Sequence, residues 1–308
     1  MKRYLPLLAL VGALGVSSLR AQPVVTVTQG EEWNLAASYE AGDLIQGLIP
    51  EVLPGDMGWH PANTDPLDQL PAFTDGIGIR HTGLTGLLND FPPAGQPAKL
   101  IRYALPVPAD VQEVRMFTGN NGRDGRVFHT YTVRFSSDGA QTFSGLIYVQ
   151  SHPSGTLNNA QFNQWRVVLS QLTDASGWLA RGVTHIEFRI YAVDNTQGQM
   201  RDPFNGVNPF TGLNDGLTAA FVSPLVWEID VLGQDSPPRL SARRSGDNLE
   251  LTWRARAPSA VIQTSPRVNP PEWTDLNPQP VIESDGFSRR VNVPIGNEPA
   301  FFRILLTP

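Results

Sequence analysis

The stretch Phe128–Phe135, FHTYTVRF, decides the fold. Along it, aromatic and valine side chains alternate with polar ones, and this period of two residues is typical of a β-strand with one buried face. The turn-forming pairs Asp124-Gly125 and Asp138-Gly139 lie on either side of the stretch. We therefore expect a strand here that is bounded by tight turns.

The same pattern recurs along the first three quarters of the chain. Further alternating or β-branched runs are Val24–Thr28, Leu100–Leu105, Val111–Phe117, Gln164–Leu169, His185–Tyr191 and Leu225–Leu232. A proline-rich turn is expected between the second and third of these runs, and no helical pattern longer than one or two turns separates them. Several short strands with turn signals between them predict an all-β protein, an antiparallel jelly-roll β-sandwich.

A domain boundary is predicted at residues 234–238, where Pro237 and Pro238 stiffen the chain into an extended linker. After it, the run Leu249–Trp253 alternates again. We therefore expect a jelly-roll domain at residues 22–233 and a small second β-sandwich at residues 239–308.

Residues 1–21 predict a signal peptide. Lys2 and Arg3 form a basic start, Leu5–Val16 is apolar, and Ala21 is a small residue suited to cleavage. The apolar run is too short to span a bilayer, which takes about 20 residues, and no later stretch is long enough. The expectation is a secreted protein, extracellular or periplasmic, without a transmembrane segment. The absence of cysteine excludes disulfides, thiolate zinc sites and a cysteine nucleophile.

Composition and motifs narrow the function classes. The 28 glycines and 27 prolines among 308 residues argue against a helical bundle. The formal net charge is −6, and beyond the signal peptide 20 basic side chains face 29 acidic ones, so nucleic acid is not an expected partner. The five histidines lack metal-binding spacing, and no Gly-x-Ser-x-Gly motif is present. Three acidic loop residues are expected to form solvated turns: Asp65, Asp68 and Asp75. The sequence therefore predicts a protein that is not an enzyme.

Candidate ligand-binding residues lie on the expected loops. Trp59 and His60 lie in the long, proline-rich segment 44–97, where the tryptophan either meets a ligand or fills the bottom of the sandwich. Four polar residues near expected strand ends are further candidates, with ordinary turn chemistry as their alternative: Arg123, Asp124, Asp194 and Asn195. Four tryptophans in or beside strand-like runs are expected in the core: Trp165, Trp178, Trp227 and Trp253.

Six short motifs follow one another between residues 24 and 233: Ala36–Ser38, Asp43–Gly47, Val114–Phe117, Gly119–Arg126, Tyr131–Gly139 and Leu225–Gly233. In this order they resemble the motifs of galactose-binding-like domains, the jelly rolls of the discoidin and coagulation-factor C type. The resemblance implies a jelly-roll fold whose loops at one end bind a ligand.

The resemblance also bears on calcium. Many sugar-binding members of that family hold a structural calcium ion through an early aspartate and a glutamate of the closing strand. Glu228 matches the glutamate, but Gln46 stands at the aspartate position, and a neutral amide weakens or removes such a site. Asp43, three residues earlier, is the candidate replacement. The prediction is therefore no cofactor, with Asp43 and Glu228 as the ligands if calcium does bind.

The C-terminal part carries four more strand-like runs: Leu249–Trp253, Ala260–Ser265, Trp273–Leu276 and Ala300–Leu305. They resemble the small fibronectin type III-like modules that end many secreted bacterial proteins. Together the two resemblances imply a non-catalytic binding protein that recognises carbohydrate or other cell-surface material through jelly-roll loops. A structural or adhesion module that binds protein partners is an alternative, which an exposed apolar patch would favour. A glycan-active hydrolase is another, which two carboxylates in a cleft would favour.

Overall fold

The structure, a computed structural model, describes residues 23–31, 35–79, 83–120, 126–151, 166–193, 202–214, 216, 222–255, 260–277, 280–296 and 300–306. In these ranges the protein is an all-β sandwich, as the sequence predicts. Its strands are accompanied by three short 3-10 helices: η1 (Ala36–Ser38), η2 (Pro66–Asp68) and η3 (Leu70–Phe73).

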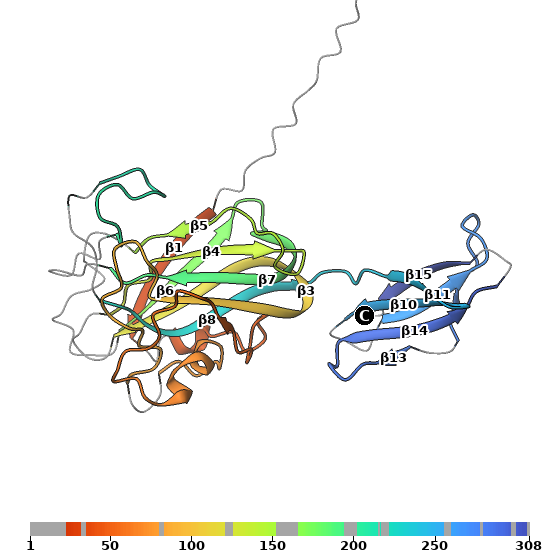
Figure 1. The fold of residues 1–308 in the computed structure, drawn as a ribbon, viewed down its shortest axis with the longest axis horizontal. Coiled ribbons are helices and arrows are strands. Elements are labelled where there is room, and N and C mark those ends of the chain that lie inside the picture. The colour runs from red at the N-terminus through yellow and green to blue at the C-terminus, as the bar shows by residue number, and fades with distance from the viewer. Residues whose placement is uncertain are drawn as a thin grey trace, which may run out of the picture.

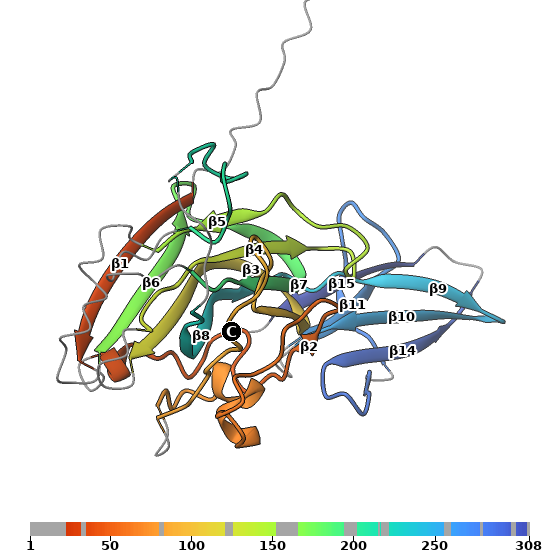
Figure 2. The ribbon, with the colours of Figure 1, turned by 60° about the vertical axis from the view of Figure 1, so that its left-hand side comes forward.

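The strands described in residues 23–235 form a large sandwich: β1 (Pro23–Glu31), β2 (Glu51–Val52), β3 (Lys99–Asn120), β4 (Tyr131–Ser136), β5 (Ile147–Val149), β6 (Arg166–Asp174), β7 (Ala180–Ile190) and β8 (Leu225–Asp235). Their hydrogen-bonded order is β1-β6-β3-β7-β4-β5, while β2 and β8 also pair with β3. All of these pairings are antiparallel. Figures 1 and 2 show these strands gathered in the larger part of the molecule, with the long, curved β3 among its partner strands.

β3 belongs to both layers of this sandwich. Its first part pairs with β2 and β7, beginning at Lys99↔Ile190, whereas its second part pairs with β6 and β8 and reaches Gly119↔Leu225. The prediction of two strands separated by a proline-rich turn is therefore wrong at this place. One strand of 22 residues replaces them.

The prolines are tolerated in β3 because of where they lie. Buried side chains alternate without a break through Ile101, Tyr103, Leu105, Val107, Ala109 and Val111. Pro106 and Pro108 occupy the outward positions between them, and the pairing with β7 shifts register between Ala104 and Ala109. Proline has no N–H to donate to a neighbouring strand. Pro106 and Pro108 are therefore tolerated here, because the hydrogen-bond ladder between β3 and β7 is already interrupted at this place.

The core of the large sandwich is built from the buried faces of both halves of β3 together with β4, β7 and β8. Phe188 on β7 packs edge-on against Tyr103, with ring centroids 6.2 Å apart, and at the same centroid distance against Tyr131. Trp227 is fully buried in a second cluster with Phe117, which confirms its predicted core position.

Residues 241–306 form a small sandwich of two sheets. One sheet contains β9 (Ser241–Ser245), β10 (Asn248–Arg254), β13 (Val281–Ile282) and β14 (Ser288–Pro294), and the other contains β11 (Ala260–Ser265), β12 (Thr274–Asp275) and β15 (Phe301–Leu306). Their inner faces share one core, in which Trp253 is buried as predicted and packs with Leu251, Ile262 and Val291.

Hydrogen bonds join the two sandwiches at the prolines of β3. Ser236 donates its N–H to the Pro108 carbonyl oxygen (2.8 Å) and its hydroxyl to Asp110 Oδ1 (2.6 Å). From the small sandwich, Arg254 Nε donates to the Pro106 carbonyl oxygen (2.7 Å). In a regular ladder these two carbonyl groups would accept from a neighbouring strand. Here they accept from Ser236 of the linker and Arg254 of the small sandwich.

The segment 44–97 is packed against the large sandwich, and it corrects one expectation. Asp65 and Asp75 cap local turns, accepting from the N–H groups of Leu67 and Ile77, as turn formers do. Asp68, however, is buried and accepts a hydrogen bond from the Thr85 hydroxyl (2.8 Å), so the prediction of a solvated turn is wrong there.

The other two tryptophans predicted for the core are Trp165 and Trp178. Trp178 is only half-buried because it lies in the turn before β7, where the Arg181 guanidinium covers its ring at 4.6 Å from the centroid. Its predicted core position is wrong. Trp165 lies outside the described residues.

Candidate functional site

Three buried carboxylates meet at β8. Glu228 and Asp230 are two residues apart on this strand and therefore point to the same side. Both are fully buried, and Asp43, only 5% exposed, lies close enough for its charge to act on both. Sequence reasoning selected Asp43 and Glu228, which the structure brings together, but it missed Asp230. The alternation of acidic residues at 228 and 230 was the available signal.

Each of these carboxylates uses one oxygen to hold a backbone segment. Asp43 Oδ1 accepts from the N–H groups of Ile45 (2.8 Å) and Val231 (3.1 Å). Glu228 Oε2 accepts from Gly76 N (2.9 Å), and Asp230 Oδ2 accepts from Glu40 N (3.1 Å). The cluster therefore ties the segment before β2 and the turn after η3 to the closing strand.

Burial and the repulsion between neighbouring carboxylates favour the protonated, neutral forms of Glu228 and Asp230. Burial first, then the charges of Asp230, Asp75 and Asp43, raise the pKa of Glu228 to about 9. Burial and the charge of Asp43 raise the pKa of Asp230 to about 7. A buried carboxylate among like charges favours its neutral form.

The two calcium ligands expected from the sequence, Asp43 and Glu228, both lie in this cluster. Calcium takes about six to eight oxygen ligands. Glu228 Oε1, Asp230 Oδ1 and Gln46 Oε1 are buried without a hydrogen-bond partner, while Gln46 Nε2 donates to the Thr74 carbonyl oxygen (2.7 Å). Within the described ranges, however, no group of three or more His, Cys, Asp or Glu side chains is arranged to hold a metal ion.

Trp59 is engaged inside the protein. Its ring packs against Phe73, with centroids 5.5 Å apart, and Lys99 Nζ lies 4.0 Å from its centroid. Lys99 is itself fully buried and pairs with Asp56 at 3.0 Å. Of the two roles open to Trp59, this geometry favours filling the sandwich over contact with a ligand.

We expect Trp59→Ala to reduce stability. Because the ring is half-buried and covers a buried cation, its loss should cost about 2–4 kcal/mol, which lowers Tm by roughly 5–15 °C. Thermal unfolding followed by circular dichroism measures this. A variant that keeps the wild-type Tm would show that the ring is free for a ligand.

His60 lies beside Trp59 but belongs to a different contact. Its Nε2 is 3.7 Å from Asp90 Oδ2, and its Nδ1 accepts from Ala62 N (3.1 Å). Asp90 also accepts two hydrogen bonds from the Arg126 guanidinium, at 2.8 and 3.1 Å. The four predicted candidates at strand ends lie outside the described residues: Arg123, Asp124, Asp194 and Asn195.

An aromatic hairpin at residues 202–214 is a candidate binding surface that sequence reasoning missed. Phe210 stacks on Tyr148 of β5, with centroids 4.6 Å apart and an interplanar angle of 11°, and is still 37% exposed. Asn208 is buried and fixes the hairpin, because its Oδ1 accepts from Phe210 N (2.9 Å) and its Nδ2 donates to the Tyr148 hydroxyl (3.2 Å). The available signal was the turn sequence Asn208–Gly212 between two apolar residues.

The hairpin projects from the large sandwich at the end remote from the small one (Figure 1). Its tip carries two more exposed apolar side chains, Val207 (61%) and Leu213 (69%). A bridge between Val207 and Asn214 and a hydrogen bond from Asn208 N to the Leu213 carbonyl oxygen (2.7 Å) close it. The tip is therefore a preformed, partly apolar surface.

Comparison with known proteins adds no relative: no family model matches the chain, and no curated protein matches it. In the part of the chain that the structure describes, no helix is long and apolar enough to cross a membrane.

Proposed function

We propose that this chain is a secreted, non-catalytic protein that binds carbohydrate through the aromatic hairpin of its large sandwich. The observation that carries the proposal is the stacked pair Tyr148–Phe210, which is held in place by the buried Asn208 and remains partly exposed. Aromatic rings held rigidly at a surface suit the apolar faces of sugar rings, and polar groups beside them suit the hydroxyls. Secretion rests on the signal-peptide pattern of residues 1–21.

Two further parts of the proposal rest on resemblance. The large sandwich is proposed to be a galactose-binding-like jelly roll, and the small one a fibronectin type III-like module that acts as a spacer or attachment element. A non-catalytic role is supported by the burial of Glu228 and Asp230, which have no exposed surface with which to meet a substrate.

Protein binding is the second candidate function, and the exposure of Val207 and Leu213 favours it. A protein partner would cover the whole apolar tip, including the aliphatic side chains, as interfaces bury contiguous patches. A sugar ring would instead contact the aromatic face. The two candidates therefore differ in which side chains of the hairpin they need.

We expect Phe210→Ala to weaken glycan binding by roughly tenfold or more, because a stacking partner and its apolar area are lost. The matched variant Leu213→Ala, on the same hairpin, should change affinity by less than about threefold. A glycan array selects the ligand, and isothermal titration calorimetry measures both variants against it.

Either of two results would redirect the proposal. An array without signal would remove the carbohydrate assignment. Equal losses in both variants, measured against a captured protein partner, would favour the adhesion module. As a control, the Tm of each variant should equal that of the wild type, which would show that neither substitution destabilises the fold.

A further inference from the structure

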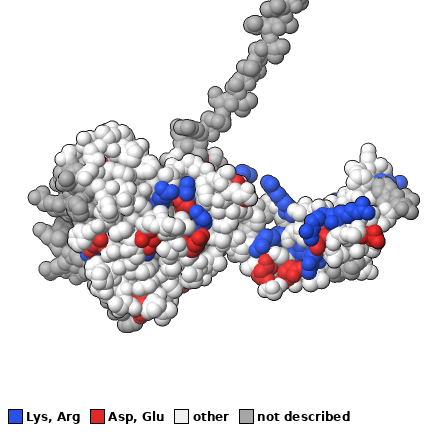
Figure 3. Space-filling view, in the orientation of Figure 1, with Lys and Arg blue, Asp and Glu red and all other residues white. Residues whose placement is uncertain are grey.

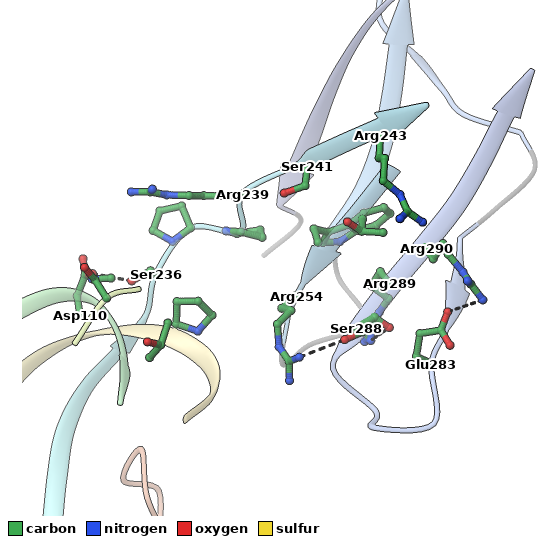
Figure 4. Close-up of a pocket in the computed structure, with 18 of the residues that line it drawn as sticks. Asp110, Ser236, Arg239, Ser241, Arg243, Arg254, Glu283, Ser288, Arg289 and Arg290 are labelled. Carbon is green, nitrogen blue, oxygen red and sulfur yellow. Dashed lines mark hydrogen bonds and ion pairs between the residues drawn. The ribbon is translucent and has the colours of Figure 1, made fainter. Parts of the chain in front are cut away.

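A cavity of about 970 Å³ lies where the two sandwiches meet, well away from the aromatic hairpin. Its walls are Pro108 and Asp110 of β3, the start of β7, the linker at Pro237 and Pro238, and the outer face of the β9-β10-β14 sheet. Figure 4 shows the arginines of that sheet and of the linker around the opening. The prolines have fixed backbone angles, so this part of the wall is rigid before any ligand arrives.

The strand register collects arginines on one face. Arg243 lies opposite Glu250, and Arg290 lies opposite Thr252, so these side chains share the outer face of the sheet. Arg254 and Ser288 form the next opposed pair on the same face. The inner positions between them carry the core residues Leu251, Trp253 and Val291.

Positive charge exceeds negative charge in this cavity. Six arginines line it, namely Arg181, Arg239, Arg243, Arg254, Arg289 and Arg290, against three acidic residues, Asp110, Glu250 and Glu283. Glu250 is shared, since one oxygen lies 2.9 Å from Arg243 and the other 3.8 Å from Arg290. The chain as a whole carries a formal charge of −6, so this excess is local. Figure 3 shows many blue side chains on the small sandwich, with red ones beside them.

Hydroxyl groups line the cavity together with the arginines. Six hydroxyl residues line it: Ser137, Thr184, Ser236, Ser241, Thr252 and Ser288. Of the described residues in the lining, Trp253 is the single aromatic one, and it is buried in the core. Guanidinium groups bind carboxylates through paired hydrogen bonds, and hydroxyl groups exchange hydrogen bonds with sugar hydroxyls. The lining is therefore unsuited to stacking a neutral sugar but matches one that carries acid groups.

We propose that this cavity binds an acidic oligosaccharide, one whose sugar rings carry carboxylate groups. This goes beyond the hairpin site, which needs no charge on its ligand. Arg239 and Arg243 are the exposed arginines expected to meet the carboxylates, while Arg254 holds the Pro106 carbonyl and is needed for the junction itself. Such pairs at a partly open site are weakened by salt.

The test is calorimetric titration of the whole protein with oligogalacturonate, at 50 and 500 mM NaCl, in the absence of calcium. We expect binding at low salt that weakens at high salt. The double variant Arg239→Ala/Arg243→Ala should lose roughly tenfold or more in affinity, since two charge-assisted contacts go. The matched control is Arg244→Ala, the neighbouring exposed arginine on β9, which is outside the cavity lining and should bind as the wild type does.

Three outcomes would overturn the assignment. The first is no binding of oligogalacturonate at low salt. The second is an equal loss in Arg244→Ala, which would indicate attraction to the charged surface as a whole. The third is tighter binding of polyglutamate of matched charge, which would make an acidic peptide the ligand. The probe is anionic and the substituted arginines are remote from Phe210. The result of this titration therefore does not depend on whether the hairpin binds glycans.

Discussion

Glu228→Gln is expected to raise the Tm at pH 9 by roughly 5–10 °C. The side chain is fully buried, and burial together with neighbouring carboxylates raises its pKa to about 9, from an ordinary value of 4.5. Each unit of such a shift corresponds to about 1.4 kcal/mol, which we discount by about half for relaxation around the cluster. Glutamine keeps the shape and an oxygen that can accept from Gly76 N, but it carries no charge.

The direction of the pH dependence follows from linkage. When folding raises the pKa of a carboxyl group, the folded state binds its proton more tightly than the unfolded state does. The resulting stabilisation is complete at pH values below the ordinary pKa of the group. That contribution is lost as pH rises through the folded values, about 7 for Asp230 and about 9 for Glu228. The wild-type Tm should therefore fall between about pH 5 and pH 9, and Glu228→Gln should flatten the upper part of this fall.

Glu187 provides a matched control with the opposite sign. It is equally buried, and although burial raises its pKa, hydrogen bonds from Arg134, Arg102 and Arg189 lower the pKa below its usual value. Glu187→Gln should therefore lower Tm at neutral pH. If both substitutions lowered Tm at pH 9, the account of Glu228 would be wrong. A calcium-induced rise in the wild-type Tm that Glu228→Gln abolishes would show that a cation, and not protons, neutralises the cluster.

Gly86→Ala is expected to produce the largest loss of stability, about 3–5 kcal/mol, or a Tm lower by roughly 10–15 °C. Gly86 has a φ of +65°, and a Cβ atom there would overlap the backbone carbonyl oxygen of Val226. The neighbouring backbone cannot move aside, because Val226 N donates to the Gly86 carbonyl oxygen (3.1 Å) and Gly86 N donates to the Asp68 carbonyl oxygen (2.8 Å).

Gly47→Ala separates overlap from backbone strain. Gly47 has a similar φ of +69°, but a Cβ atom there would have no atom within 4 Å. Its alanine variant should lose only about 1 kcal/mol, the ordinary cost of a left-handed residue. Chemical denaturation of both variants gives the two free energies of unfolding. Equal losses would show that the contact between Gly86 and β8 is not what limits the substitution.

The fold class was readable from the sequence because period-two alternation reports a half-buried strand directly. The runs at Val24–Thr28 and Leu249–Trp253 are confirmed as parts of β1 and β10, and the run at His185–Tyr191 is confirmed as part of β7 up to Ile190. The error at Pro106 and Pro108 arose because proline usually ends a strand. Its tolerance depends on a register shift in the neighbouring strand, which no local pattern reveals.

The site was less predictable, since it depends on contacts between distant segments. Asp43 and Glu228 were found through the motifs in which they lie, but the raised pKa values of the cluster follow from burial and from Asp230. Trp59 looked like a ligand contact because its loop lacks a periodic pattern. Its partner Lys99 lies 40 positions along the chain, and a buried lysine is rarely predicted from sequence.

Because β3 pairs with strands of both layers, its pairing also determines when this protein can fold. β3 is complete once residue 120 has been made, yet its neighbour β8 begins more than 100 positions later and pairs along most of its second half. Contacts between such distant parts of a chain form slowly, because a long loop must close first. During synthesis, the edge of β3 that pairs with β8 therefore stays unpaired until about residue 235 has left the ribosome. A released chain that ends before β8 should remain sensitive to protease, whereas a released chain that ends after residue 240 should be resistant.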